Sequence, residues 1–204
     1  MAEITAALVK QLRDRTNAGM MDCRKALQDA GGDLDKAAVL LRERGIAKAD
    51  KRAGRETSNG LVESYLHRTS DDFPPQIGVL VEVDCETDFV AKGDDMKKLA
   101  RELAMHIAAA NPRWVQKEDV PAEVLERERE LYRRKAEQDG RPQAAWERIV
   151  EGQERKFYEE NVLLEQFWVR EPKTPIKDLI AQTVATVQEN VNVRRFSRFS
   201  IKEG

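Results

Sequence analysis

The segment from residue 77 to residue 85 constrains the fold most strongly, because its side chains alternate between two kinds. By the period of two, one face of an extended chain carries the apolar side chains Ile77, Val79, Val81, Val83 and Cys85. The other face carries the acidic side chains Glu82 and Asp84, and Glu86 continues this row just after the segment. A strand with one apolar and one polar face is typical of an antiparallel sheet that is covered on one side. The chain therefore needs further strands beside this one and a helix over its apolar face.

The residues that flank this strand supply both requirements. Residues 61–67 form a second strand candidate, and the loop 71–75 between the two contains a Pro-Pro pair that cannot continue either strand, so we expect an antiparallel hairpin. Asp94 or Asp95 is expected to cap the helix that follows, which should end at residues 111–112 (Asn-Pro). The apolar stripe of that helix is Met96, Leu99, Leu103 and Ile107.

The rest of the second half predicts more helix and one more strand. A charged helical hairpin is expected over about residues 117–160, interrupted at residues 139–142 (Asp-Gly-Arg-Pro). Its inner face should carry Trp146, Ile149, Val150, Gln153 and Phe157. A helix over 176–189 leads to a strand over 191–201 that should pair with the first hairpin. The predicted class is therefore α+β, a core of small antiparallel sheet packed with helices and a projecting helical hairpin.

The first fifty residues predict three short helices. A turn at residues 16–19 separates the first two, Asp33 is a good N-cap for the third, and Gly45 suits its C-terminal end. A basic, partly helical linker follows over residues 48–56. The predicted organisation is a ubiquitin-associated-like three-helix module with its linker over residues 1–54, and a core domain over 55–204.

Composition narrows the functional classes. The chain has 35 Lys and Arg against 37 Asp and Glu, so its formal net charge of -2 gives no field that attracts nucleic acid or an anionic membrane. Cys23 and Cys85 form no C-x-x-C pair, which fits a reducing compartment. The N-terminus lacks a signal-peptide pattern, and no run of eighteen apolar residues occurs, so we expect a cytoplasmic protein.

The acidic row along the strand raises the question of a metal site. Glu82, Asp84, Glu86 and Asp88 alternate, and carboxylates in such a row can bind a divalent cation, as in a metal-dependent phosphoesterase. The favoured alternative is the solvated face of a half-buried strand, because the sequence has neither histidine at ligand spacing nor a glycine-rich phosphate loop. We therefore expect no bound metal and no enzymatic activity.

The two histidines and one basic strand leave alternatives open. His106 lies on a predicted helix, where packing or a satisfied hydrogen bond is the default. His67 closes a strand at a loop, where contact with a partner and a simple surface role are about equally favoured. Residues 194–199 interleave Arg and Phe, as some RNA-binding strands do. An edge strand protected by its charges is the favoured interpretation.

Three apolar residues fall where loops are predicted. Phe89 comes after the alternation has ended, so it is either a plug for a partner's pocket or, in the slightly favoured alternative, a cap on the chain's own core. Met20 and Met21 follow Gly19 in the loop between two helices, where Met adapts well to a partner surface, although one of the two is a candidate to fill the small module.

Two long motifs resemble the elongation factor Ts family. They are LRDRTNAGMMDCRKAL at residues 12–27 and EVDCETDFVAK at residues 82–92, with MHIAA at 105–109 and RRF at 194–196 as further family-like sequence. The resemblance covers essentially the whole chain. It implies a guanine-nucleotide exchange factor of translation elongation that binds elongation factor Tu and ejects GDP, with the magnesium and the nucleotide carried by the partner and no cofactor in this chain.

The resemblance also implies residue roles. Asp88 and Phe89, within the segment Thr87 to Val90, would enter the partner's GTPase domain near its magnesium and phosphate site. Other partner-binding residues would be Arg13, Met20, Met21 and His67. Asp84 stands where the family usually has Asn, and Ser197 offers no thiol for a cross-link between subunits.

Oligomerisation follows from the short form of this chain. Longer family members carry two half-cores, one with the Thr-Asp-Phe-Val segment and another with a strand ending in His. Here residues 64–67 (SYLH) resemble that second strand, so both features occur in one copy. A two-fold homodimer that offers Phe89 from one subunit and His67 from the other is the expected assembly.

Overall fold

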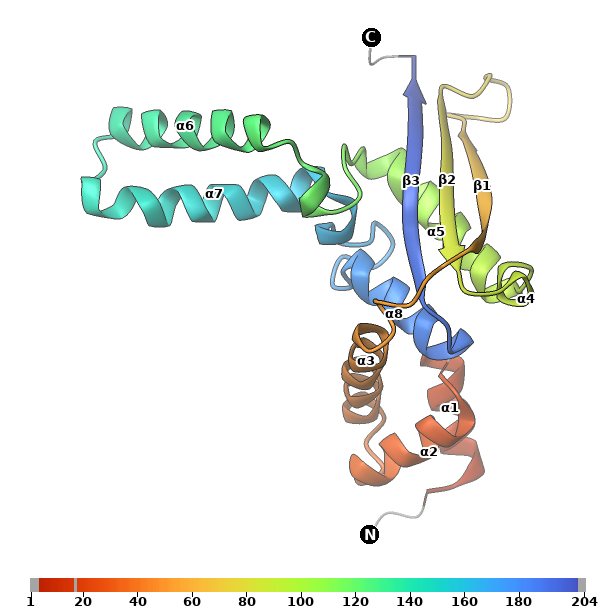
Figure 1. Cartoon of the computed structure of the whole chain (residues 1–204). Coiled ribbons are helices and arrows are strands. Elements are labelled where there is room, and N and C mark those ends of the chain that lie inside the picture. Colours follow the sequence, from red (N-terminus) through yellow and green to blue (C-terminus); the bar gives the residue numbers. More distant parts are fainter. Residues whose placement is uncertain (1–3, 17, 202–204) are drawn as a thin grey trace. The chain divides into compact units, whose positions relative to one another are not determined.

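The computed structural model describes residues 4–16 and 18–201 (Figure 1). By their internal contacts the residues fall into two compact units. The first comprises Met1–Tyr65, Leu80–Ala104 and Lys177–Ser197, and the second comprises Leu66–Val79, Met105–Ile176 and Arg198–Gly204. Asn17, in the predicted turn at 16–19, lies outside the described residues.

The sheet confirms the prediction made from strand alternation. Its three antiparallel strands are β1 (Asn59–His67), β2 (Ile77–Cys85) and β3 (Val191–Ser200), in the order β1-β2-β3. Along β2 the side chains of Val79, Val81, Val83 and Cys85 are buried. The strands approach closely at Gly60, where a Cβ atom would lie 2.6 Å from the carbonyl oxygen of Val83. The α+β class is confirmed.

The helix that follows the hairpin is α5 (Asp94–Ala110), and its predicted stripe is buried throughout. Asp94 and Asp95 lie inside its first turn, so the prediction that one of them is the cap was wrong. Carboxylates there still favour the helix through its dipole. The helix ends where expected, since Asn111 adopts a left-handed backbone with φ of 50°.

In the first unit, α5 lies against β1. The guanidinium of Arg101 donates to the carbonyl oxygen of Ser64 at 2.8 Å and lies over the ring of Tyr65, 4.9 Å from its centroid. These contacts fix which face of β1 is covered, and the figure shows the helix behind the strands (Figure 1).

The N-terminal module consists of α1 (Ala6–Thr16), α2 (Met20–Asp29) and α3 (Leu34–Asp50). Its core side chains are fully buried at Leu12, Cys23, Ala26, Leu27 and Ala37. Asp33 caps α3 as predicted, because its side chain accepts from the backbone N–H groups of Asp35 and Lys36. The three-helix module is confirmed.

Gly45 does not end α3, and that prediction was wrong. The residue is buried within the helix and faces α8 (Ile176–Val187), where a Cβ atom would lie 3.7 Å from the Cβ atom of Ala185. Beside it, Nε of Arg42 donates to the buried carboxylate of Asp178 at 2.7 Å. A small residue lets the two helices approach closely, so this glycine serves packing and not termination.

The second unit contains the predicted helical hairpin. Its helices are α6 (Ala122–Gln138) and α7 (Trp146–Asn161), with short 3-10 turns η1 (Lys117–Asp119), η2 (Gln143–Ala145) and η3 (Leu163–Glu165). The two helices pack on each other and are joined by Arg129, which donates to both carboxylate oxygens of Glu154 at 2.8 and 2.9 Å. Gln153 is exposed, so its placement on the inner face was wrong, and the half-buried neighbour Glu154 takes that place.

Candidate partner-binding site

The segment Thr87 to Val90 forms a short helix and not the predicted loop. This helix, α4 (Asp88–Ala91), follows β2 after a single turn, and Thr87 is its N-cap, with an extended backbone. The hydroxyl oxygen of Thr87 accepts from the backbone N–H of Val90 at 3.4 Å. The thiol of Cys85 donates to the carbonyl oxygen of Thr87 at 3.1 Å, which ties the turn to the end of the strand.

The first turn of α4 directs Phe89 outward. Its side chain is 83% exposed, while the next residue, Val90, is buried at 8%. The alternative in which Phe89 caps the chain's own core was therefore wrong. Val90 fills that position, and Phe89 is the most exposed of the large apolar side chains that the structure describes. An aromatic ring held in water on a folded turn is typical of a partner contact.

Asp88 lies beside Phe89 and forms an ion pair with Lys92 across 2.6 Å on the same helical turn. The hydrogen bond from Lys92 holds the pKa of the Asp88 carboxyl below its usual value. The carboxylate is thus fully charged at neutral pH, and its exposure leaves it accessible to a partner.

Two other carboxylates of the acidic row accept hydrogen bonds within the chain. Glu82 accepts from Nε of Arg195 at 2.6 Å, and Glu86 accepts from the backbone N–H of Asn190 at 2.6 Å. Burial raises the pKa of Asp84. In residues 4–16 and 18–201, no three His, Cys, Asp or Glu side chains are grouped to hold a metal ion. The hydrogen bonds of Glu82 and Glu86 join this row to Asn190 and Arg195, before and within β3.

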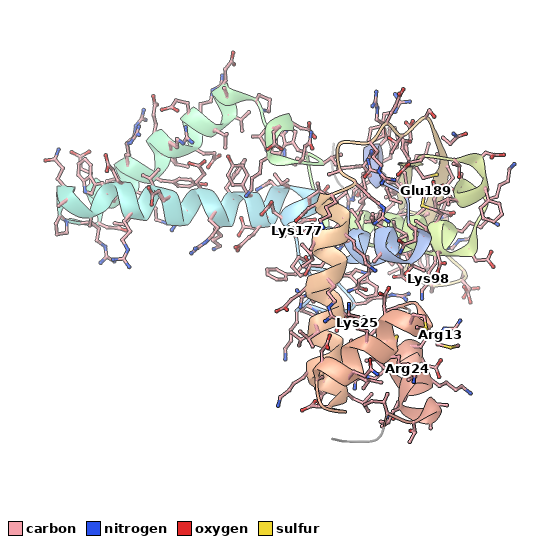
Figure 2. The ribbon with its side chains drawn as sticks, turned by 60° about the horizontal axis from the view of Figure 1, so that its bottom comes forward. Arg13, Arg24, Lys25, Lys98, Lys177 and Glu189 are labelled. Atoms are coloured by element: carbon pink, nitrogen blue, oxygen red, sulfur yellow. The ribbon has the colours of Figure 1, made fainter. Side chains whose placement is uncertain are left out.

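Three predicted site residues meet at one groove of the N-terminal module. Arg13 of α1 and Met20 and Met21 of α2 line a hollow of about 520 Å³. The other lining residues are Ile4, Ala6, Val9, Lys10, Asp14 and Arg24. Met20 and Met21 begin α2, so their prediction as loop residues was wrong, and both are exposed, so neither fills the module core. The groove has apolar walls and three cations, of which Arg13 and Arg24 can be followed in Figure 2.

The histidines occupy opposite environments, each in the second unit. His67 is exposed at the end of β1, and its carbonyl oxygen accepts from the N–H of Gln76 at 3.0 Å. His106 is fully buried, with Nε2 2.9 Å from Oε1 of Gln166 and Nδ1 accepting from the N–H of Val169 at 3.4 Å. Burial lowers the pKa of His106. The packing role predicted for His106 is confirmed, and the partner role of His67 stays a prediction.

The Arg/Phe strand is partly engaged within the chain. Arg195 is held by Glu82, and in the second unit the guanidinium of Arg198 donates to the carbonyl oxygen of Ala108. Phe199 is exposed at 72%. Two of the three arginines thus contribute to the sheet and its neighbours, as expected of an edge strand protected by charge.

Comparison with known proteins identifies the family. The model of the family described as elongation factor TS matches residues 46–203. The chain is 52% identical over 201 residues to elongation factor Ts of Thermoanaerobacter sp. (strain X514), covering 98% of this chain and 96% of the relative. It is also 52% identical to elongation factor Ts of Frankia alni, and 51% identical to that of Fervidobacterium nodosum, each over the whole relative. The chain belongs to the elongation factor Ts family.

Membership of the elongation factor Ts family places the chain among translation elongation factors, with a role in protein biosynthesis. Within the part of the chain that the structure describes, no helix has the length and apolar character needed to cross a membrane. Residues 12–27, which suggested the family from sequence, include five of the groove residues, and residues 82–92 include the α4 turn.

One residue near the α4 turn was not found from the sequence of this elongation factor Ts family member. Glu189 follows α8 and accepts two hydrogen bonds from Thr87, which is 102 positions away. Lys10 and Arg24, which line the groove, were also missed. No local pattern marks Glu189, because its partner lies on another element. The helical spacing of Lys10, Arg13 and Asp14 would have placed Lys10 beside Arg13.

Proposed function

We propose that this chain is a guanine-nucleotide exchange factor that binds elongation factor Tu in its GDP form and promotes GDP release. The observation that carries the proposal is the α4 turn, in which Phe89 is exposed while Val90 anchors the turn in the core. A ring presented on a folded turn enters a pocket at a lower entropic cost than a ring on a mobile loop. Membership of a translation elongation factor family supports this choice of partner.

In this mechanism Asp88 and Phe89 enter the partner near its magnesium and phosphate site. Phe89 opens a pocket, and the charged carboxylate of Asp88 disfavours the anionic nucleotide nearby. Arg13, Met20 and Met21 hold a second surface of the same partner through the groove. Because the two ligands are linked, GDP weakens binding of the exchange factor by the same factor by which the exchange factor weakens GDP binding.

The proposed activity makes and breaks no covalent bond. Displacement of GDP needs only differential binding to the two states of the partner, so the chain needs no catalytic group. The magnesium and the nucleotide belong to the partner, and we propose that this chain works with no cofactor of its own, without direct nucleic-acid or membrane contact. We place the activity in the cytoplasm, where elongation takes place.

The direct test is release of labelled GDP from elongation factor Tu. The native chain should accelerate release, and Phe89→Ala should reduce that acceleration by about tenfold to a hundredfold, as expected for the loss of one buried aromatic anchor. Phe73→Ala is the matched control, because Phe73 is also an exposed phenylalanine but lies in the loop between β1 and β2. Absence of acceleration by the native chain would overturn the proposed function.

We also propose that the working form is a two-fold homodimer in which His67 of the partner subunit acts beside Phe89. The chain has one copy of each feature. In the second unit, the exposed apolar side chains of Leu66, Phe199 and Ile201 line one groove next to His67, which fits a surface covered by a second copy.

Mixing experiments test this arrangement. Sedimentation should show a dimer, and Phe89→Ala and His67→Ala homodimers should each be impaired. Mixed dimers of these two variants should regain up to half of the native acceleration, because one of their two composite sites has both native residues. A strictly monomeric chain with full exchange activity would contradict the dimer and leave the exchange function standing.

A further inference from the structure

Glu189 forms a two-point contact with the N-cap of α4. The backbone N–H of Thr87 donates to Oε2 of Glu189 at 2.9 Å, and the hydroxyl of Thr87 donates to Oε1 at 2.6 Å. Both carboxylate oxygens are used, so rotation of either residue breaks at least one bond. Hydrogen bonds to a carboxylate are among the strongest that side chains make. Figure 2 labels Glu189 at the end of α8.

The backbone on both sides of Glu189 is also fixed. Gln188 adopts a left-handed backbone with φ of 64°, which ends α8, and its side-chain oxygen accepts from Arg52 at 2.8 Å. On the other side, the N–H of Asn190 donates to the carboxylate of Glu86 at 2.6 Å. The backbone that carries the Glu189 side chain is therefore held on both sides, and the bonds to Thr87 hold its carboxylate.

The contact orients the hydroxyl of Thr87. Because its hydrogen is donated to Glu189, the oxygen lone pairs face the backbone of α4, where they accept from the N–H of Val90. A helix of four residues lacks intrinsic stability and depends on such external bonds. Glu189 thus acts on α4 through Thr87.

We propose that Glu189 is a positioning residue for nucleotide exchange, which holds the turn of α4 so that Val90 is buried and Phe89 is presented to the partner. This inference rests on the proposed function and names a residue that neither the family motifs nor the exposed surface indicates. Glu189 does not need to touch the partner. Without its two bonds the turn samples other conformations, and those that bury the ring of Phe89 compete with binding.

The test is a double-mutant cycle on GDP release from elongation factor Tu. Glu189→Ala should slow release by about tenfold, the effect of losing a charge-assisted pair of hydrogen bonds. In a Phe89→Ala background the same change should alter release by less than about twofold, because the side chain that Glu189 positions is gone. The inference would be overturned if Glu189→Ala accelerated GDP release as much as the native chain does. It would also be overturned if Glu189→Ala slowed release by the same factor in the native and Phe89→Ala backgrounds.

Companion variants keep the test decisive if Glu189→Ala does not fold. Thr87→Val removes the hydroxyl and should slow GDP release in the same way as Glu189→Ala, whereas Thr87→Ser keeps the hydroxyl and should support faster release than Thr87→Val. Equal release by the serine and valine variants would overturn the inference. Glu43→Ala is the matched control, since Glu43 is an exposed carboxylate on α3 of the same unit.

Amide hydrogen exchange separates this inference from the proposed function. Glu189→Ala should accelerate exchange at the N–H groups of Thr87 and Val90 by about tenfold, with Glu43→Ala unchanged. This measurement needs no partner. If the native chain fails to accelerate GDP release, the proposed function is overturned, while the effect of Glu189 on the α4 turn can still be measured. Unchanged protection at Thr87 and Val90 in Glu189→Ala would overturn the positioning role of Glu189 alone.

Discussion

The two segments proposed to bind the partner both expose apolar side chains from the first turn of a helix, but they are held in different ways. Met20 and Met21 begin α2, whose N-cap is Gly19, a residue without a side chain that could cap the helix. That helix has ten residues and is anchored by fully buried Cys23, Ala26 and Leu27. By contrast, α4 has four residues and one buried anchor, and its N-cap is bonded to a distant carboxylate.

The difference shows two solutions to one physical problem. An exposed ring or thioether tends to fold back onto its own chain, because burial of such a side chain is favourable by about 1.5–3 kcal/mol. A helix with a full apolar stripe resists this by burying its opposite face. A turn too short for a stripe resists it through directed hydrogen bonds. The methionine surface should thus fail when packing fails, and the Phe89 turn when polar contacts fail.

The largest expected effect comes from removing packing below the methionines. Leu27→Ala removes a fully buried side chain of α2 and should lower the free energy of unfolding of the module by about 2–5 kcal/mol. Urea unfolding followed by circular dichroism measures it. The N–H of Val90 should keep its protection from exchange, and Val39→Ala, at an exposed position of α3, is the control. Loss of protection at Val90 in Leu27→Ala would show that the α4 turn also depends on packing in the N-terminal module.

A pH titration tests polar contacts in the second unit, where buried His106 is held by hydrogen bonds with Gln166 and Val169. Burial depresses the pKa of His106 below its usual value of 6.5, so the folded chain keeps the ring neutral while the unfolded chain protonates it as pH falls. Stability from this group is thus fully present above about pH 6.5 and declines as the pH falls toward the folded pKa. Protonated Nδ1 can no longer accept from Val169.

The titration compares two matched variants, each with one of the two histidines replaced by glutamine. His67→Gln leaves His106 in place and should retain the decline in unfolding free energy below pH 6.5, whereas His106→Gln should flatten it. Amide exchange at Val169 should accelerate over the same range in the native chain. An identical pH dependence in both variants would show that His106 does not carry it.

The parts of the fold that could be predicted from the sequence are those in which the sequence signal and the structure that it specifies lie within one helix or strand. The alternation along β2 specified a covered antiparallel strand, and Asp33 specified the start of α3, because each signal acts over two or three residues. The prediction that Gly45 ends α3 was wrong because glycine both ends helices and permits close helix packing. Only the position of α8 shows which of the two roles applies here. The role of Glu189 could not be predicted for the same reason, since it depends on a contact with Thr87, which is distant in the sequence.

Two substitutions of Gly45 should change the free energy of unfolding in opposite directions, and by less than Leu27→Ala does. Gly45→Ala should raise the free energy of unfolding by about 0.5–1 kcal/mol, because glycine is unfavourable inside a helix and the added Cβ atom meets Ala185 at an ordinary contact distance of 3.7 Å. Gly45→Leu overfills the contact with α8 and should lower it by about 1–3 kcal/mol. Thermal unfolding measures both. A stabilised leucine variant would show that α3 and α8 do not approach closely at this position.

The smallest expected effect on stability comes from the methionines themselves. The double change Met20→Ala and Met21→Ala should alter the free energy of unfolding by less than about 0.5 kcal/mol, since both side chains are exposed and α2 keeps its buried face. The affinity for elongation factor Tu, measured by calorimetry, should nevertheless fall by about tenfold or more. Leu131→Ala, at an exposed position of α6, should change neither quantity. A large loss of stability in the methionine variant would mean that these side chains hold their own helix, which would remove the distinction between the two turns.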